Sequence, residues 1–511
     1  MKTLMIGGLA YLACSAVFWM TANAQTAEGQ PQAQPQGPPQ YLDLRYDEDW
    51  SHIKEIQGPH DFFDPIKYIT LNDRGWYMTL GGEIRQRYDS WHDALFGEAS
   101  GGTPLPPYLN DNLQRYLFHA DTHLGEHVRV FTQVQSSLEF GKTGGPWYSD
   151  RDTFEVHQAF VDFRSSADAR HYTLLRIGRQ EVALGADHFV STADFFNARR
   201  VFDGARLIIG SGSWTWFLDA TKPVIEKEGA FDDVPEHGRS TWGGGFFAPN
   251  PLTKKGQIGV FYVGLDTKHQ LWWRGLPPCL EGVPLLQCSG RDQRHTLGAR
   301  IEGFQSGWDY TYELLGQFGT FTPVQGPSES IRAWAITTDT GFTFMKSRHY
   351  PRVGVRSNVT SGDSGHGSLG TFHPLFPDTA YSGKLGLVGP SNVIDLTPAA
   401  RFAATRRIYC LAEWTFFWRE NTNDAIYSPA LPTTPISTGI TGYLEFPSFN
   451  HAKYVGNQLG LGTQFTIDRH LTYTVGYNYF TVGQFLKDTP PTVLPPGKNV
   501  GYFVTWLTYK F

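Results

Sequence analysis

The sequence predicts an all-β fold, a transmembrane antiparallel β-barrel of about 18 strands, with 16 strands as the smaller alternative. Three observations lead to this prediction. Segments of strand length alternate apolar and charged residues and show little helical periodicity, and the connections between them are short and long in turn. The last segment carries an aromatic face. The competing fold is a soluble β-sandwich, whose dry core would not tolerate the charged faces.

The composition agrees with such a barrel. The 511 residues include 36 Phe, 24 Tyr, 15 Trp and 55 Gly, which suit the aromatic girdles and tight turns of a membrane barrel. The mean hydropathy of −0.33 would indicate a soluble chain, but only alternate residues of a barrel strand face lipid. No apolar run of about 20 residues follows the N-terminal segment, so no transmembrane helix is predicted. The net charge of −6 gives no indication of a nucleic-acid partner.

The N-terminal residues are predicted to lie outside the barrel. Residues 1–24 have the features of a secretory signal peptide, with Lys2 before an apolar run and the small-x-small cleavage site Ala22-Asn23-Ala24. Residues 25–40 are rich in Gln and Pro and are predicted to be a disordered linker. Residues 41–75 are interpreted as a periplasmic lead-in, and residues 76–511 as the barrel.

The first three predicted strands show the alternation most clearly. They cover residues 76–88, 112–124 and 127–140, and each has an apolar face opposite a charged or polar one. Apolar side chains toward lipid and charged side chains toward water are the arrangement of a water-filled barrel. The charged or polar faces carry Glu83, Arg85, Arg87, Arg115, His119, Asp121, His123, Arg129, Gln133, Gln135 and Glu139.

The connections between predicted strands alternate in length. Outer-membrane barrels have short periplasmic turns and long extracellular loops, because successive strands run in opposite directions. A sandwich has no reason to sort its loops in this way. The short connections are residues 124–127, 164–171, 210–213, 248–255, 304–308, 345–350 and 467–470. The long ones are residues 89–111, 141–153, 180–202, 222–239, 266–291, 360–392, 420–453 and 484–498. The strand pattern is weakest at residues 330–344 and 393–402.

The final segment, residues 499–511, is predicted to close the barrel. Its largely apolar face consists of Phe511, Tyr509, Leu507, Thr505 and Phe503, found by counting back in twos. A terminal aromatic residue gains nothing in water, whereas in a barrel strand it lies at the membrane interface. The pattern is similar to the C-terminal signature recognised by the barrel assembly machinery. An even number of strands places both barrel termini in the periplasm of a Gram-negative cell.

Several short motifs, in order along residues 41–511, resemble the alginate export porin family. The resemblance implies an outer-membrane β-barrel, and the member that gives the family its name passes an anionic polysaccharide. The resemblance implies fold and compartment more strongly than it implies the solute. The motifs are Arg45-Tyr46-Asp47-Glu48-Asp49-Trp50, Ile66-Lys67-Tyr68-Ile69, Leu80-Gly81-Gly82-Glu83-Ile84-Arg85-Gln86-Arg87-Tyr88, Arg176-Ile177-Gly178-Arg179-Gln180-Glu181, Phe202-Asp203-Gly204-Ala205-Arg206-Leu207 and Ser361-Gly362-Asp363 followed by Phe376-Pro377.

The predicted inward-facing residues suggest anion selectivity. Guanidinium groups in a narrow pore attract carboxylated solutes, and arginine stays charged and can bind a carboxylate through two hydrogen bonds. The alternative is that arginines pair with neighbouring carboxylates and only stiffen the wall, as Glu83 with Arg85 and Arg300 with Glu302 would. The candidate lumen residues are Glu83, Arg85, Arg87, Arg115, His119, Asp121, Arg129, Arg179, Arg199, Arg200, Arg300, Arg352 and Arg356.

Residues 180–202 form a candidate constriction loop. They contain Asp187, His188, Asp194, Arg199 and Arg200. If the loop folds into the lumen, both arginines would lie in the solute path, and exchanging them for Glu would reverse the ion preference. The alternative is a solvated outer loop.

Three cysteines follow the predicted signal peptide. Cys279 and Cys288 flank a short loop that contains proline, and they could form a disulfide in an oxidising compartment. Cys410 falls on an apolar strand face, where it would act as a small hydrophobic residue.

The sequence predicts no enzyme, metal or cofactor. Gly362-Asp363-Ser364-Gly365 is similar to the nucleophile turn of serine proteases, but it lies in a Gly/Ser-rich loop without a matching triad. His119 and His123 share a strand face, but they are about 13 Å apart, which is too far for one metal ion. The segment before the first strand is too short for the plug of a TonB-dependent transporter.

The sequence therefore predicts an outer-membrane channel. It would pass hydrophilic, anionic solutes such as uronate-containing oligo- or polysaccharide by passive diffusion through an arginine-lined lumen. The expected partners are outer-membrane lipid, the barrel assembly machinery and the anionic solute, without nucleic acid. The alternatives are a general porin, an uptake porin for aromatic or small acids, a plugged structural or adhesive barrel, and a membrane-embedded enzyme.

Overall fold

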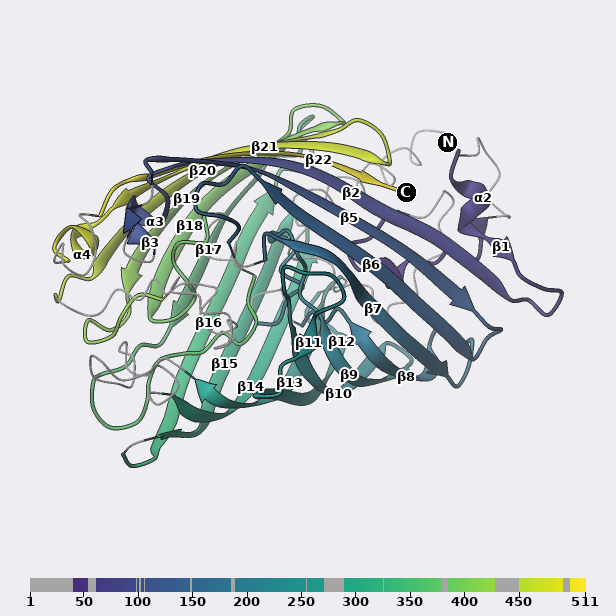
Figure 1. The fold of residues 1–511 in the computed structure, drawn as a ribbon, viewed down its shortest axis with the longest axis horizontal. Helices are drawn as coiled ribbons and strands as arrows, with labels where there is room; N and C mark the ends of the chain where they lie inside the picture. Colours follow the sequence, from purple (N-terminus) through teal and green to yellow (C-terminus); the bar gives the residue numbers. More distant parts are fainter. Residues whose placement is uncertain are drawn as a thin grey trace.

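The protein folds as a closed antiparallel barrel of 18 strands with few helices. Figure 1 shows the fold in the computed structural model. The structure describes residues 40–53, 61–97, 99–100, 103–104, 106–147, 149–184, 189–253, 255–270, 289–324, 326–378, 385–427, 450–489 and 497–511. The predicted signal peptide and all of the predicted linker except residue 40 lie outside the described residues. So do Asp187, His188, Cys279 and Cys288.

The barrel strands are hydrogen-bonded to their neighbours in chain order, and β2 pairs with β22 to complete the cylinder. Because of this pairing, Ile84 lies opposite Tyr509 and Glu83 opposite Lys510. The strands are β2 (Tyr77–His92), β5 (Tyr108–His123), β6 (Val128–Phe140), β7 (Asp152–Arg164), β8 (His171–Gln180), β9 (Phe202–Ser211), β10 (Trp214–Ile225), β12 (Arg239–Pro249), β13 (Gln257–Gln270), β14 (Gly290–Gln305), β15 (Trp308–Pro323), β16 (Glu329–Thr343), β17 (Arg352–Thr360), β18 (Val393–Ala403), β19 (Ile408–Arg419), β20 (Tyr454–Thr466), β21 (Leu471–Val482) and β22 (Val500–Lys510).

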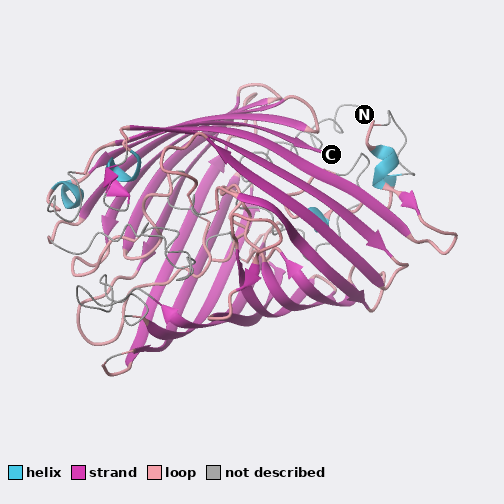
Figure 2. Ribbon diagram, viewed as in Figure 1, coloured by secondary structure: helices cyan, strands magenta, loops and turns pink. Residues whose placement is uncertain are grey.

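The prediction of 18 strands is confirmed, and the alternative of 16 strands is wrong. The two segments with the weakest strand pattern, residues 330–344 and 393–402, form β16 and β18. Strands dominate the molecule, as Figure 2 shows, and the remaining elements are small. These small elements are β1 (Ile69–Thr70), β3 (Ala99–Ser100), β4 (Thr103–Pro104), β11 (Val234–Pro235), η1 (Arg45–Asp47), α2 (Asp64–Lys67), α3 (Ala94–Gly97) and α4 (Gln484–Lys487). Among the described residues, no helix is long and apolar enough to cross a membrane.

The two faces of the strands differ as the alternation predicts. On β10, Trp214, Trp216 and Leu218 are exposed, whereas Thr215 and Phe217 between them are buried. On β22, Phe503 and Leu507 are exposed, and Tyr502, Val504 and Lys510 point to the buried side. Exposed large apolar side chains therefore cover the outside of the cylinder, where they suit lipid. Cys410 of β19 is a free thiol and shares the outward face with the exposed Trp414, as predicted.

The connections alternate between the two ends of the barrel, also as predicted. Every short connection expected from the sequence lies at one end, hereafter the short-turn end, which also includes residues 404–407. The long connections lie at the opposite, long-loop end. One connection at that end is itself short, because only residues 324–328 join β15 to β16.

Apolar clusters inside the cylinder show that the connections enter it. One cluster joins Phe217, Phe261 and Leu315, which face inward from the strands, to Phe189 and Phe376 of two connections. A second cluster contains inward residues of β2, of β5 and of the five strands from β18 through β22. It joins them to connections at the long-loop end. An 18-stranded cylinder is wide enough to leave a channel, and in this protein chain segments fill part of that space.

Replacing one outward residue by a charge tests the assignment of the outer face. Leu314 of β15 is 56% exposed, so Leu314→Arg would place a cation against lipid and lower the free energy of unfolding in vesicles by about 2–4 kcal/mol. The matched control is Thr311→Arg, because Thr311 faces inward on the same strand, opposite Asp339. Equal unfolding free energies for the two variants would contradict the assignment.

Candidate functional site in the barrel lumen

Three segments lie inside the barrel and define the candidate site. The first inner loop is the described part of residues 181–201 between β8 and β9, namely residues 181–184 and 189–201. The second inner loop is the described part of residues 361–392 between β17 and β18, namely residues 361–378 and 385–392. The third is residues 41–53 before the first barrel strand, hereafter the N-terminal strap. Each contacts inward-facing side chains of the wall.

Asp194 anchors the first inner loop. Its carboxylate accepts hydrogen bonds from Arg85 of β2 (3.0 Å) and Arg115 of β5 (2.7 Å), and it lies 3.3 Å from Arg199 of the same loop. Burial alone would raise the pKa of Asp194, but the guanidinium groups of Arg115, Arg85 and Arg199 hold it well below its ordinary value. The carboxylate therefore stays charged and fixes the loop to the wall.

Backbone contacts extend this anchor across three strands. Arg87 donates to the carbonyl of Phe195 (2.6 Å), and Ser137 of β6 donates to the carbonyl of Asn197 (2.9 Å). The side-chain Nδ2 of Asn197 donates to the backbone carbonyls of Gln114 and Leu138, each at 3.1 Å. The predicted inward fold of this loop is present, and the alternative of a solvated outer loop is wrong.

The prediction that Arg199 and Arg200 lie in the solute path is wrong. The side chain of Arg199 is buried against Glu181, with Nε 2.8 Å from its carboxylate, and His157 of β7 binds the same carboxylate at 2.9 Å. Arg200 donates to the backbone carbonyls of Ser191 and Phe376. Both arginines hold the loop together instead of projecting into an open path, because the loop carbonyls and carboxylates need buried donors. Reversing their charge is therefore expected to disrupt the loop, and ion preference could not be read from that change.

The second inner loop packs against the first. The amide of Ser191 donates to the carbonyl of Phe376 (2.9 Å), and the amide of Phe376 donates to the carbonyl of Phe189 (3.0 Å). On the wall side, Arg294 of β14 donates to the carbonyl of Thr371 (3.1 Å), and Gln317 of β15 donates to that of His373 (2.7 Å). The sequence prediction omitted Arg294 and Gln317, although parity along their strands would have placed both inside.

Most of the predicted wall charges form pairs. Within the described strands, Glu83 lies 2.7 Å from Arg115 and 3.4 Å from Arg85, and Arg300 lies 2.7 Å from Glu302. The pairs Glu83 with Arg85 and Arg300 with Glu302 are the ones that the sequence offered as the alternative to a selectivity ring. Three other predicted lumen residues also have partners on the wall. Arg87 binds Asp89 (2.7 Å), Arg129 binds Asp121 (2.6 Å), and His119 stacks on Phe131 with ring centroids 5.4 Å apart.

A second charged area lies on the inner face of β15 to β18. Arg352 binds Asp339 (2.7 Å) and, through Nε, Asp309 (2.9 Å). Arg401 of β18 is the register partner of Arg352, and Arg356 lies further along β17 on the same face. Arg356 and Arg401 are half-buried, whereas Arg115, Arg199 and Arg294 are almost fully covered. The sequence prediction included Arg352 and Arg356 but not Arg401.

Arg179 does not belong to the lumen set. On β8, Arg179 shares a face with the exposed Ile177, whereas the buried Arg176 lies on the opposite face. Its side chain pairs with Asp203 of β9 at 2.8 Å. The register between β8 and β9 runs without interruption through this pair. Arg179 was included from a motif, whereas counting in twos from Arg176 places it on the outward face.

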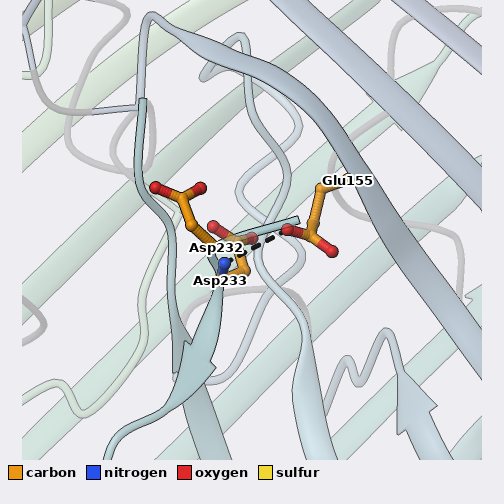
Figure 3. A group of neighbouring side chains, drawn as sticks. All are labelled: Glu155, Asp232 and Asp233. Atoms are coloured by element: carbon orange, nitrogen blue, oxygen red, sulfur yellow. Dashed lines mark hydrogen bonds between the residues drawn. The ribbon is translucent and has the colours of Figure 1, made fainter. Parts of the chain in front are cut away.

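Three carboxylates meet where the connection between β10 and β12 packs against β7. Oxygens of Glu155, Asp232 and Asp233 lie within 4.8 Å of one another (Figure 3). Carboxylate oxygens suit a hard divalent cation, but here backbone groups already bind two of the three carboxylates, those of Glu155 and Asp233. The amide of Asp233 donates to Glu155 (3.1 Å), and the amide of Lys227 donates to Asp233 (2.7 Å). These hydrogen bonds explain the group as an anchor of the connection, and we assign no metal to it.

Comparison with known proteins identifies the family. Residues 76–496 match the family described as alginate export. The chain belongs to the alginate export family. No curated protein matches the sequence.

Solved structures share the fold of this alginate export family member. OccAB1 of Acinetobacter baumannii is 10% identical, covering 85% of this chain and 96% of its own, with a TM-score of 0.50. OpdO of Pseudomonas aeruginosa is 10% identical over 84% and 97%, with a TM-score of 0.51. A BenF-like porin of Pseudomonas fluorescens Pf-5 is 9% identical over 85% and 98%, with a TM-score of 0.51. The family and the porin fold support an outer-membrane channel for solutes.

Removing the charge of Asp194 tests the anchor of the first inner loop. In Asp194→Asn three buried guanidinium groups lose their shared carboxylate, and breaking a buried ion pair costs about 3–5 kcal/mol. We expect the loop to loosen, which increases open-channel current noise and protease cleavage within residues 181–201. Asp168→Asn, in an exposed short turn, should match the wild type. An unchanged current and cleavage pattern in Asp194→Asn would show that the anchor lies elsewhere.

The acidic group predicts a pH dependence of the connection over residues 226–238. Burial and the negative charges of Glu155 and Asp232 raise the pKa of Asp233 to about 7. The folded state therefore binds a proton more tightly than the unfolded state, whose pKa is close to the ordinary value, so stability falls as pH rises from about 4 to about 7 and is level above that. Burial also raises the pKa of Glu226 to about 8.

Hydrogen exchange measures this effect. After correction for intrinsic rates, amides of residues 226–238 should exchange faster at pH 8 than at pH 5. Asp233→Asn mimics the protonated state and keeps an oxygen for the amide of Lys227, so it should reduce the difference. Equal pH dependence in the variant and the wild type would exclude Asp233 as the titrating group.

Proposed function

We propose that this outer-membrane channel passes hydrophilic, anionic solutes, such as uronate-containing oligo- or polysaccharide, by passive diffusion. The family is named for the export of alginate, which is a polyanion. In this proposal the short turns and both barrel termini face the periplasm. A protease-cleavage tag in the turn of residues 404–407 that stays protected in intact cells would support that orientation.

The observation that supports anion passage is the group of arginines on β17 and β18. Arg356 and Arg401 are half-buried on the inner face, and Arg352 beside them adds a third guanidinium group, which binds Asp309 and Asp339. A guanidinium group that keeps some exposure in a narrow path can meet a passing carboxylate, whereas the covered arginines of the first inner loop serve as anchors.

Reversal potentials in planar bilayers test the proposal. The wild-type channel should prefer anions, and Arg356→Glu with Arg401→Glu should shift the anion-to-cation permeability ratio several-fold toward cations, because two inner-face charges are reversed. The control is Arg291→Glu, since Arg291 pairs with Asp266 and is 50% exposed on the outward face. Uronate oligomers should block the current more strongly than neutral oligosaccharides of equal length.

One observation favours a second candidate function. The inner loops and the N-terminal strap fill part of the cylinder, as in a plugged structural or adhesive barrel whose outer loops do the work. A wild-type protein that forms a folded barrel but carries no current would support this candidate. A current without ion preference would instead indicate a general porin.

A further inference from the structure

The N-terminal strap is buried, although it precedes the barrel in the chain. Tyr46 is 2% exposed and Trp50 3%, and Arg45 and Glu48 are also buried. Chain segments before a first strand are ordinarily poorly ordered unless contacts hold them. The contacts of the strap therefore show what it does in the folded protein.

The strap lies against the inner wall. The ring of Tyr46 meets the rings of Phe131 and Phe160 edge-on, with centroids 6.1 and 5.6 Å apart. Arg176 of β8 lies 4.1 Å above the ring of Tyr46, and Arg129 of β6 donates to its carbonyl (2.6 Å). These partners project inward from β6, β7 and β8, so the strap occupies lumen space.

The strap also spans the seam between the first and last strands. Arg45 donates to the carbonyls of Gly82 on β2 (2.7 Å) and Phe511 after β22 (3.0 Å), and Glu48 holds its guanidinium group at 2.6 Å. Asp43 binds Lys510 of β22 at 2.9 Å. Charge-assisted hydrogen bonds of this length are strong, so the strap is fixed to the wall on both sides of the seam.

The far side of the strap contacts the first inner loop. The hydroxyl of Tyr46 donates to the carbonyl of Glu181 (3.0 Å), and Arg199 donates to the carbonyl of Asp43 (3.2 Å). Arg199 also binds the carboxylates of Glu181 and Asp194. The strap thus joins the network that anchors the first inner loop through Asp194.

We propose that the N-terminal strap is a positioning element of the channel, which occupies part of the lumen and holds the first inner loop, and thereby sets the width of the conducting path. Tyr46 is its central residue, because one side chain contacts the wall through its ring and the loop through its hydroxyl group. The proposal rests on the channel function, but it does not require anion selectivity.

Single-channel conductance of the full-length protein tests the proposal. Tyr46→Ala removes both contacts, so conductance should rise, on the order of twofold if a comparable cross-section is opened. Tyr46→Phe keeps the ring and loses the hydrogen bond to Glu181, so it should give a smaller rise with more current noise. Phe62→Ala is the control, because Phe62 precedes the barrel in the same way but is 88% exposed. It should match the wild type.

Barrel folding is checked in each variant by the mobility shift of unheated protein in detergent gels. Folded Tyr46→Ala barrels with wild-type conductance and noise would overturn the proposal. It would also be overturned if Tyr46→Ala and Tyr46→Phe both failed to form barrels, since Tyr46 would then act in folding. If the wild type carried no current and Tyr46→Ala did, the result would support the proposal, with the strap closing the path. If neither protein carried current, the proposal would be overturned. Loss of anion preference in a conducting wild type affects only the proposed solute class.

Discussion

The pairing of β2 with β22 is the constraint on which the rest of the structure depends. A strand edge left open inside a bilayer would leave backbone N–H and C=O groups without partners, so a membrane sheet must close on itself. In this protein Glu83 and Lys510 meet across that closure. The same seam receives Arg45 of the strap, and Glu83 also binds Arg115, which holds Asp194. Barrel closure and lumen architecture therefore share residues.

Charge pairing explains why several arginines lie covered inside the barrel. An uncompensated buried charge is costly, and a buried charge is tolerated when a partner and hydrogen bonds satisfy it. Arg115 and Arg199 meet this condition through Glu83, Asp194 and Glu181, and they therefore hold the first inner loop against the wall. The number of arginines inside the barrel consequently says little about ion preference. Exposure within the lumen is the more relevant property, and it separates the half-buried Arg356 and Arg401 from the covered Arg115 and Arg199.

The strands could be predicted from the sequence, whereas the lumen could not. Side-chain alternation is local, so Glu83, Arg115 and Asp121 were placed on the inner face by counting in twos. The same rule would have excluded Arg179 and included Arg294 and Arg401. Contacts of the inner loops join positions far apart in the chain, as Tyr46 and Glu181 do, and no periodicity encodes such pairs. The lead-in motif containing Tyr46 gave a family resemblance but no indication of burial inside the barrel.

The width of an 18-stranded cylinder explains why chain segments enter it. Its own side chains cannot fill the interior, so the space holds either water or protein. Phe189, Phe372 and Phe376 give the two inner loops apolar surface that is buried against Phe261 and Leu315 of the wall, and this burial favours insertion. The loops then replace a wide water-filled bore by a narrower path. In the proposed channel, the inserted segments and their anchors therefore determine what can pass.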